Sequence, residues 1–285
     1  MHFRGKRMIK PFGKTLSEPH PNPNIRIISL GAGVQSTVMA LMADKGEIGP
    51  RPDCAIFADT GYEPKGVYEH LNWLEEELSY PVYRVSIGNI KQDSLKGVNK
   101  SGTRFVAMPF FTKKGGMGMR QCTNDYKIQP LRKKTRELLG LKYREKSKGL
   151  ISETWLGISW DEMIRMKESR DQFIYHRFPL IELEMRRHQC VAWFDKHYPG
   201  KALTKSACIA CPFHNNELWR DMKKNDPVSF KDAVEFDKKI RKLPTFEQEQ
   251  FVHRSCKPLD EVDFDNAEDK GQMSFLDECD GMCGV

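Results

Sequence analysis

The sequence predicts an α/β fold, in which a parallel sheet is flanked by helices and followed by a helical C-terminal part and a mobile acidic tail. Short apolar, β-branched runs alternate with segments of helical periodicity over the first half of the chain. Such alternation favours parallel strands joined by crossovers, with ligand sites at the carboxyl ends of the strands. A chain of 285 residues can also bury a full core without disulfide bonds.

Each element is bounded by glycine, proline or polar residues. The first apolar run ends at a glycine pair and the second at Asp59-Thr60-Gly61, while Asp226-Pro227 is typical of a helix N-terminus. Residues 88–120 are rich in glycine and lysine, which predicts a long binding loop rather than a core element. We expect strands at 25–30, 54–58, 82–87 and 154–158, and helices at 36–45, 67–78, 129–139, 186–197, 215–224 and 226–241.

Composition divides the chain into four parts. A basic, proline-rich segment (1–24) precedes the α/β domain (25–160, with the loop insertion 88–120), a helical cysteine-bearing part packed on the same domain (161–258) and the acidic tail (259–285). No run approaches the roughly 20 apolar residues of a membrane span, and Met1–Lys14 lacks the apolar block of a signal peptide. We therefore expect a cytoplasmic protein that does not bind membranes.

The net charge of +7 is unevenly distributed. The tail carries −8, so residues 1–258 carry +15, and residues 127–148 hold nine basic and two acidic side chains. A body of this charge attracts polyanions. Lys133, Lys134 and Arg136 are therefore candidate nucleic-acid contacts, with an ordinary solvated helix face as the alternative.

Residues 27–37 combine a strand, a glycine turn and hydroxyl residues that open a helix. Glycine lets backbone amides approach an anion, and a helix N-terminus adds N–H groups and a favourable dipole. The segment lacks the Gly-Lys-Ser/Thr end of a Walker loop and the third glycine of a dinucleotide fingerprint. It predicts an anion-binding turn, with a plain strand-to-helix connection as the alternative.

This loop resembles that of the PP-loop adenine-nucleotide superfamily, particularly its phosphoadenosine-phosphosulfate (PAPS) reductase branch, which also has an Asp-Thr-Gly-Tyr stretch like residues 59–62. The resemblance implies a Rossmann-like, adenine nucleotide alpha hydrolase-like domain that binds ATP, PAPS or adenylylsulfate (APS). Gln35 stands where ATP-cleaving members have Asp, which argues against Mg²⁺-assisted cleavage and makes Mg²⁺ only an optional cofactor. The implied nucleotide-binding residues are Ser29, Gly31, Ala32, Gly33, Gln35, Ser36, Asp59, Thr60, Gly61 and, after the fourth strand, Arg165.

Four of the eight cysteines form a candidate metal site. Cys208 and Cys211 make a C-x-x-C turn whose thiolates can reach one metal, and Cys122 and Cys190 precede it. A zinc ribbon would need two such turns, so the pattern favours a site closed by tertiary contacts, such as an iron–sulfur cluster. Zinc and metal-free thiols are the alternatives.

The surroundings of these cysteines resemble iron–sulfur adenylylsulfate reductases. Those enzymes carry a Cys-Cys pair before a Lys-x-x-Pro-Leu segment, and Gln121-Cys122 precedes such a segment at 127–131. Because Gln121 replaces the first cysteine, the resemblance implies a 4Fe-4S cluster with Cys190 as the replacement ligand. Three cysteines with an open iron, as in some tRNA-thiolating relatives, are the alternative.

The last residues carry two further thiols, Cys279 and Cys283. Sulfonucleotide reductases end in a similar Glu-Cys-Gly-aliphatic-His tail, although the final His is absent here. The resemblance implies that Cys283 is the catalytic nucleophile and that Cys279 can resolve a disulfide or persulfide formed on it. A disordered tail with incidental cysteines is the alternative.

The leading hypothesis is an enzyme that binds an adenine nucleotide and an iron–sulfur cluster and transfers sulfur to a nucleic acid, either tRNA or DNA. The first alternative is a sulfonucleotide reductase, and the second is an inert, metal-stapled nucleic-acid-binding protein. The implied protein partners are a thioredoxin-like reductant or a cysteine desulfurase. The sequence does not predict an oligomeric state.

Overall fold

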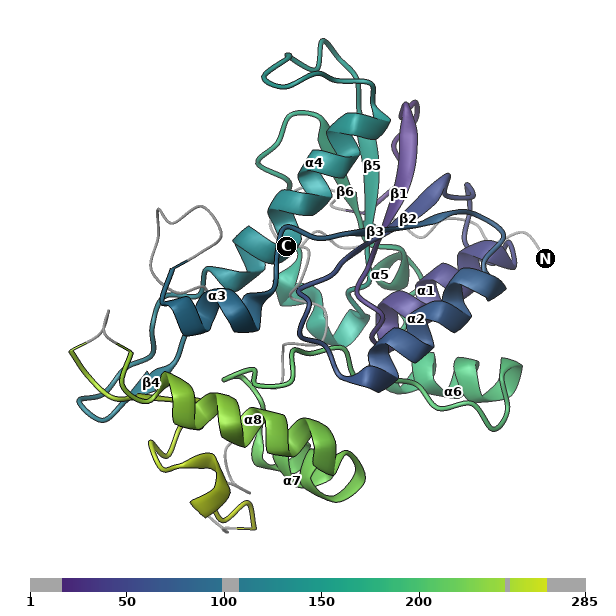
Figure 1. The fold of residues 1–285 in the computed structure, drawn as a ribbon. Helices are drawn as coiled ribbons and strands as arrows, with labels where there is room; N and C mark the ends of the chain where they lie inside the picture. The colour runs from purple at the N-terminus through teal and green to yellow at the C-terminus, as the bar shows by residue number, and fades with distance from the viewer. Residues whose placement is uncertain (1–16, 99–107, 244–246, 266–285) are drawn as a thin grey trace.

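Five parallel strands form the central sheet, in the order β3-β2-β1-β5-β6 (Figure 1). The computed structural model describes residues 17–98, 108–243 and 247–265. Parallel pairing joins every neighbouring pair of strands, which confirms the predicted α/β class. The strands are β1 (Ile25–Leu30), β2 (Cys54–Ala58), β3 (Val82–Val85), β5 (Ser152–Leu156) and β6 (Ile174–Arg177).

Helices connect these strands and form the C-terminal part. Within the described residues, no helix is both long and apolar enough to cross a lipid bilayer. The helices are α1 (Val34–Asp44), α2 (Lys65–Glu77), α3 (Ile90–Lys96), the π-helix η1 (Thr123–Ile128), α4 (Gln129–Leu138), the 3₁₀-helix η2 (Trp160–Arg165), α5 (Pro179–Glu182), α6 (Arg187–His197), α7 (Asn216–Asn225), α8 (Pro227–Ile240) and the 3₁₀-helix η3 (Leu259–Glu261).

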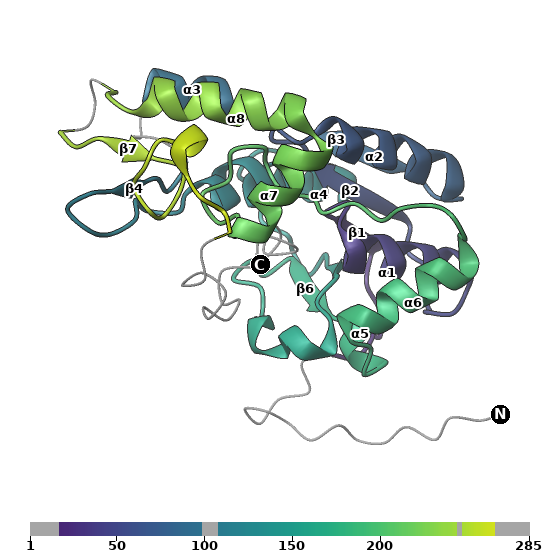
Figure 2. The same cartoon turned by 90° about the horizontal axis from the view of Figure 1, so that it is seen from below.

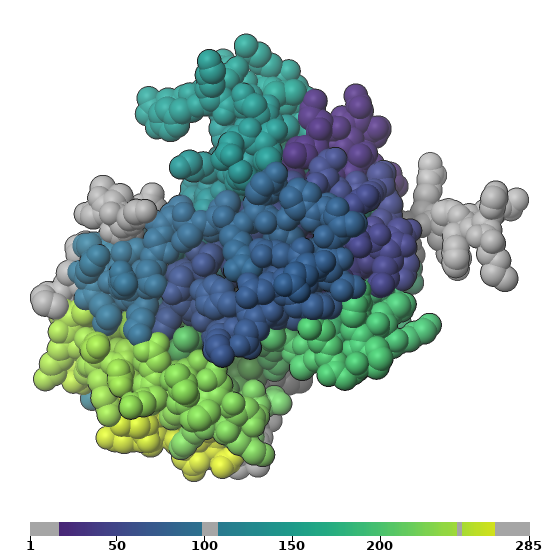
Figure 3. Space-filling view, turned by 45° about the vertical axis from the view of Figure 1, so that its right-hand side comes forward, coloured from purple at the N-terminus to yellow at the C-terminus, as the bar shows by residue number. Residues whose placement is uncertain are grey.

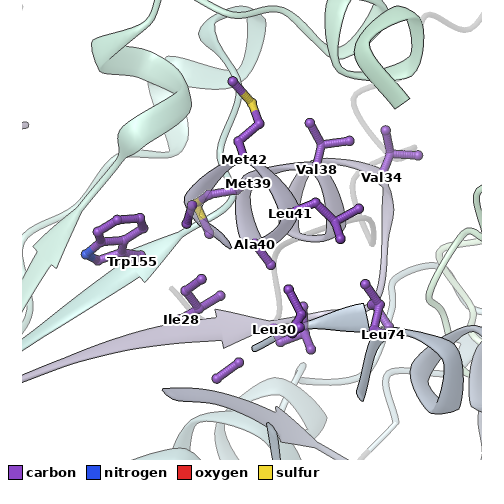
Figure 4. Packing of buried hydrophobic residues seen from close by; sticks show 14 of the residues in the cluster. Ile28, Leu30, Val34, Val38, Met39, Ala40, Leu41, Met42, Leu74 and Trp155 are labelled. Carbon is purple, nitrogen blue, oxygen red and sulfur yellow. The ribbon is translucent and has the colours of Figure 1, made fainter. Parts of the chain in front are cut away.

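The two faces of the sheet carry different helices because side chains alternate along each strand. Ile28 and Trp155 belong to the large cluster that α1, α2 and α6 complete (Figure 4). Ile27 and Ile56 point to the opposite face, where Leu131 of α4 covers them. Figure 1 shows α4 on one side of the sheet and α1 and α2 on the other.

A second hydrophobic cluster lies beyond the sheet and joins α3, α7 and α8 to the segment that follows them (Figure 2). Buried Asp237 of α8 accepts hydrogen bonds from the backbone N–H groups of two cluster residues, Val252 (2.9 Å) and Leu259 (3.2 Å). Lys91 of α3 forms an ion pair with Asp232 of α8. In Figure 3 the yellow-green C-terminal part lies directly against the blue segment that holds α3.

The structure differs from the sequence prediction in several places. The insertion 88–120 contains α3, which Asn89 caps by accepting a hydrogen bond from Gln92 N–H and which ends at Gly97 with φ 74°. It also contains β4 (Phe111–Thr112), which pairs with β7 (Gln250–Phe251). Strand β6 and helix α5 have no counterpart in the prediction, and residues 259–264 pack into the second cluster, because Leu259, Val262 and Phe264 supply buried apolar side chains.

Candidate nucleotide and thiol site

The candidate site lies at the carboxyl edge of the sheet, where parallel strands deliver their following loops to one place. The turn after β1 (31–36), the turn after β2 (59–61) and the residues after β5 (157–159) all meet this edge. Gly157 approaches α1 so closely that an added Cβ would lie 2.8 Å from the backbone N of Ser36. The loops after β1 and β5 are therefore in direct contact.

The turn after β1 presents the N-terminus of α1. Gly33 is the N-cap residue and provides no side-chain cap, while Ala32 adopts a left-handed conformation with φ 56°. The Ser36 hydroxyl accepts a hydrogen bond from Gly31 N–H (3.1 Å) and lies 3.3 Å from the Gly33 carbonyl oxygen. The Thr204 hydroxyl stabilises the turn by donating a hydrogen bond to the Ala32 carbonyl oxygen (3.0 Å). This geometry suits an anion at the helix N-terminus.

A buried polar cluster fixes the first turn of α1. The Gln35 side chain, 3% exposed, donates to Glu162 (3.1 Å) and accepts a hydrogen bond from Arg187 (2.8 Å). Arg165 in turn donates to Glu162 at 2.9 Å. Burial raises the pKa of Glu162, while the guanidinium of Arg165 opposes that rise. The guanidiniums of Arg165 and Arg187 and the carboxylate of Glu162 therefore stand beside the helix N-terminus, and Asp161 is next to them, accepting a hydrogen bond from the backbone N–H of Arg187 (3.1 Å).

Arg187 and Glu162 are functional candidates that sequence reasoning did not assign, whereas it did assign Gln35 and Arg165. Arg187 begins α6, about 150 positions after Gln35 in the sequence. No local motif joins two such distant residues, so only the packing of α6 against α1 reveals the contact.

The turn after β2 is shaped by the carboxylate of Asp59. It accepts hydrogen bonds from the Gly61 N–H (2.7 Å) and from the Tyr68 hydroxyl (2.8 Å). Gly61 has φ 71°, and an added Cβ would lie 2.9 Å from the Asn89 amide nitrogen, so this position needs glycine. Asp59 thus orders the turn and aims Thr60 at the cysteine region described next.

Cys122, Cys208 and Cys211 line one small pocket together with Thr60, Arg120 and Lys127, and we call this the thiol pocket. The Cys208 Sγ lies 3.3 Å from the Thr60 hydroxyl and 3.6 Å from a carboxylate oxygen of Glu63. The C-x-x-C turn is tied to the loop after β2, because Ile209 N–H donates to the Tyr62 carbonyl oxygen at 2.8 Å. Cys122 therefore lines the same pocket as the sequence-distant pair Cys208 and Cys211, beside the loop after β2.

Charged side chains support the thiol pocket from behind. Glu63 is buried, accepts a hydrogen bond from the Thr60 hydroxyl (3.1 Å) and lies 3.8 Å from the ammonium of Lys127. Lys127 is in π-helix η1, a rare element that frequently occurs at functional sites. Neither Glu63 nor Lys127 was assigned a role from sequence, although both stand inside the motifs around Asp59 and Cys122.

Cys190 does not join the other three predicted ligands. It lies on α6, fully buried in the cluster with α1 and the sheet, and burial raises its thiol pKa to about 12. Cys190 and Phe194, one turn apart, share the helix face that packs on α1. The structure thus does not bring Cys190 together with the other three predicted ligands, because its spacing in sequence says nothing about which side of the sheet α6 covers.

The chemistry of the thiol pocket fits a soft metal, since thiolates are the ligands that iron–sulfur clusters and zinc prefer. Across 17–98, 108–243 and 247–265, however, no three His, Cys, Asp or Glu side chains already stand at metal-binding spacing. The pocket therefore has a suitable donor set in Cys122, Cys208 and Cys211, whose side chains would have to move to close around a metal.

The remaining predicted residues fall into two groups. On α4, Lys133 is exposed, whereas Lys134 pairs with Glu137 (2.6 Å) and Arg136 donates to the carbonyl oxygens of Lys142 and Glu145 (both 2.8 Å). Lys134 and Arg136 therefore have partners within the fold, and the nucleic-acid role of all three residues stays a prediction. Cys279 and Cys283 lie outside the described residues.

Comparisons with known proteins add the following. No protein-family model matches the chain, and no curated protein matches its sequence. The solved PAPS reductase from Candida auris, a phosphate complex, is similar to 62% of this chain over 74% of its own, with 13% identity and a TM-score of 0.40. The U34-tRNA thiolase NcsA from Methanococcus maripaludis, with its [4Fe-4S] cluster, is similar to 76% of this chain over 73% of its own, with 17% identity and a TM-score of 0.38. Because these values are low, the fold assignment rests on the strand order itself.

Proposed function

We propose that this protein is a PAPS reductase-like PP-loop enzyme that binds an adenine nucleotide at the turn after β1 and uses a metal–sulfur centre in the thiol pocket to transfer sulfur to a nucleic acid. One observation carries the proposal: Cys122 and the pair Cys208 and Cys211, 86 positions apart in sequence, line one pocket beside the turn after β2. Cysteines that only fill the core are not expected to lie beside Thr60, Glu63 and Lys127 at the carboxyl edge of the sheet, where ligands of parallel sheets bind.

The nucleotide end of the site supports a phosphate ligand. The N-terminus of α1 offers backbone N–H groups and a favourable dipole, and the guanidiniums of Arg165 and Arg187 stand beside it. Gly157 keeps the loop after β5 in contact with Ser36, so the phosphate-binding turn is held on both sides. Because residues 59–62 resemble a motif of the PAPS reductase branch, we favour an adenine nucleotide as the ligand.

The thiol end supports proton transfer away from a cysteine. Glu63 is placed to accept the proton of the Cys208 thiol, directly at 3.6 Å or through the Thr60 hydroxyl. Lys127 stays beside Glu63 and offsets its charge in this buried position. A deprotonated Cys208 is what metal binding requires. When bound by Cys122, Cys208 and Cys211, a 4Fe-4S cluster would supply an iron with an open position that can carry sulfide.

The nucleic-acid acceptor is inferred from charge. Residues 1–258 carry +15, and Lys142, Arg144, Lys146 and Lys148 are exposed in the loop after α4. A small sulfonucleotide does not need an extended positive surface, whereas a polyanion does. We therefore favour tRNA or DNA as the acceptor.

A sulfonucleotide reductase is the second candidate, and Gln35 favours it. Gln35 is locked by Glu162 and Arg187 and offers an amide where a metal-binding carboxylate would be needed to cleave ATP with Mg²⁺. In that reaction PAPS or APS would occupy the same edge, and the thiolate of Cys283 would attack the sulfate sulfur, break its bond to the nucleotide phosphate and release the adenosine phosphate, which leaves an S-sulfocysteine. A thioredoxin-like dithiol would then release sulfite, regenerate the Cys283 thiol and end as a disulfide.

An anaerobic assay distinguishes the two candidates. The protein is purified without oxygen, analysed for iron, sulfide and zinc, and offered PAPS, APS, or ATP with tRNA or DNA and a sulfur donor, with mass spectrometry of all products. We expect about four irons per chain, as in a four-iron cluster, and a thiolated or phosphorothioated nucleic acid. Sulfite formed from PAPS or APS would favour the reductase.

The matched control is the Lys65→Ala variant, whose side chain lies on the exposed start of α2 and should behave as the wild type. A colourless protein with one zinc per chain, and without a sulfur-containing product from any substrate, would contradict the enzyme proposal and favour a metal-stapled binding protein.

A further inference from the structure

A second, larger cavity opens on the α4 face of the sheet, away from the carboxyl edge. Helix α4 packs across β1, β2 and β3 on this face of the sheet. The loop 167–171 stands opposite α4, and together they enclose about 480 Å³. We call this cavity the side pocket; its volume lies in the range of small-molecule sites.

The floor of the side pocket is polar. Thr154 of β5 and His176 of β6 are register partners and share the face of Ile27. The Nδ1–H of His176 donates to the Lys167 carbonyl oxygen (2.8 Å), which leaves Nε2 of the neutral ring as an acceptor. Burial lowers the pKa of His176, so the ring is neutral near pH 7. The floor thus offers a hydroxyl and an imidazole acceptor, which suit the polar edge of a heterocycle.

The walls and rim of the side pocket differ from its floor. Ile128, Leu131 and Ile174 form an apolar wall, and Arg132 is neutralised by an ion pair with Asp171. On the rim, Lys167 and Arg170 are exposed, and in the part of the chain that the structure describes their cationic groups have no ion-pair partner. Glu168 is the remaining acidic side chain, so the rim is net positive. The apolar wall suits the face of a nucleobase, and the polar floor suits the edge of that base. The two rim cations suit a phosphate.

The side pocket is separate from the proposed nucleotide and thiol site. Its lining includes no residue of the turns 31–36 and 59–61. Helix η1 forms the partition, because Thr123 and Lys127 line the thiol pocket while Asn124 and Ile128 line the side pocket. Each pair is one turn apart, so two faces of one π-helix serve the two cavities.

We infer that the side pocket binds a nucleoside monophosphate, with the base between Leu131 and Ile174, the base edge at Thr154 and His176, and the phosphate at Lys167 and Arg170. A purely apolar ligand would leave the floor and the rim cations unused, and an inorganic anion would leave most of the cavity and its apolar wall empty. Two kinds of ligand carry these groups: a free mononucleotide, and one nucleotide within a single strand of nucleic acid. This inference stands apart from the proposed function, because it needs neither a metal nor sulfur chemistry.

Photolabelling tests the location. The full chain is irradiated with 8-azido-AMP, or with a short single-stranded oligonucleotide that carries one 8-azidoadenosine, and the labelled peptides are mapped. We expect label within residues 124–132 or 167–176. Label from AMP identifies a free mononucleotide as the ligand, and label from the oligonucleotide alone identifies a nucleotide of a strand. Label confined to peptides with residues 29–36 or 57–63, or no saturable label with either probe, would overturn the inference.

A charge-reversal pair tests the contacts. In the Lys167→Glu/Arg170→Glu variant, saturable labelling of the side pocket should need at least about tenfold more probe, because two charge-assisted contacts are lost. The control is Lys231→Glu/Lys239→Glu, which makes the same charge change at exposed residues of α8 outside the pocket. Equal weakening by both variants would show a general charge effect and would also overturn the inference.

Discussion

Cys190 and Cys208 are both buried, with 0% and 8% of their surfaces exposed, yet their surroundings differ completely. Cys190 lies among apolar side chains of α1 and α6, on the face of the sheet that α1 covers. Cys208 lies beyond the carboxyl edge, against the hydroxyl of Thr60 and the carboxylate of Glu63. Burial by itself therefore does not distinguish a packing thiol from a reactive one. Polar groups that can accept the thiol proton make that distinction.

The same contrast holds between the two hydrophobic clusters. The cluster around the sheet packs apolar helices against buried strands, and its polar groups serve mainly to fix α1 and α2. The cluster beyond the edge mixes cysteines, Tyr62 and the aromatic residues of α7 and α8, and it borders the thiol pocket. The first cluster holds the sheet and its covering helices together, and the second brings cysteine and tyrosine side chains to the edge of the sheet.

The largest expected effect concerns metal binding. Cys208→Ser and Cys211→Ser should lose essentially all reconstituted iron or zinc, because each removes a thiolate from the thiol pocket, whereas Cys190→Ser should keep the wild-type content. Elemental analysis after anaerobic reconstitution measures this, and Cys54→Ser is the control for a buried strand cysteine. Equal metal loss in Cys190→Ser would abolish the distinction drawn between the two cysteines.

The next largest effect tests how tightly the sheet and its covering helices are packed. Gly157→Ala should lower the free energy of unfolding by about 3 kcal/mol, because the new Cβ would meet the backbone of Ser36 at 2.8–2.9 Å. Urea unfolding measures the change. Gly66→Ala is the matched control, since nothing lies within 4 Å of its Cβ and alanine favours a helix by about 0.5 kcal/mol or more. Similar losses in both variants would contradict the tight contact.

A pH effect should follow from His70, which joins α2 to Thr37 of α1 (Nε2 to Oγ1, 3.0 Å). Burial, followed by the charge of Lys201, lowers its pKa from 6.5 to about 4. The folded state then binds fewer protons than the unfolded state, so its contribution is fully present above pH 6.5 and is lost as the pH falls towards 4.

The expected loss from His70 at pH 5 is about 2 kcal/mol of unfolding free energy. Urea unfolding at pH 7.5 and pH 5 measures it in the wild type and in His70→Gln, which cannot gain a proton. Identical pH dependence in the two proteins would assign the effect to other groups.

The smallest effects are expected for two cationic side chains of α4. Arg136 is hydrogen-bonded within the fold, whereas Lys133 faces solvent. Arg136→Ala should cost about 1 kcal/mol of stability, because it removes hydrogen bonds to the Lys142 and Glu145 carbonyls. Lys133→Ala should leave stability unchanged and lower the salt slope of polynucleotide binding by about 1, since one phosphate contact is lost. An unchanged slope would make Lys133 an ordinary solvated side chain.

Much of the fold could be predicted because its signals are local. The apolar runs at 25–30 and 54–58 and the Asp226-Pro227 helix start all appear where they were expected. Strand β6 could not be recognised, because Ile174–Arg177 is short and half polar, and its role depends on pairing with β5. Helix α3 was missed although its Asn and Gly caps were visible, because the surrounding glycines suggested a loop.

The sequence by itself determined the α/β class, the two turns at the strand ends and the C-x-x-C turn, because alternation, glycine turns and closely spaced thiols act over a few residues. Only the tertiary structure decided which distant groups meet. It brought Cys122 to Cys208, separated Cys190 from both, placed Arg187 on Gln35 and left a cavity beside α4. Such contacts depend on which face of the sheet each helix covers, and that is fixed by the packing of the whole chain.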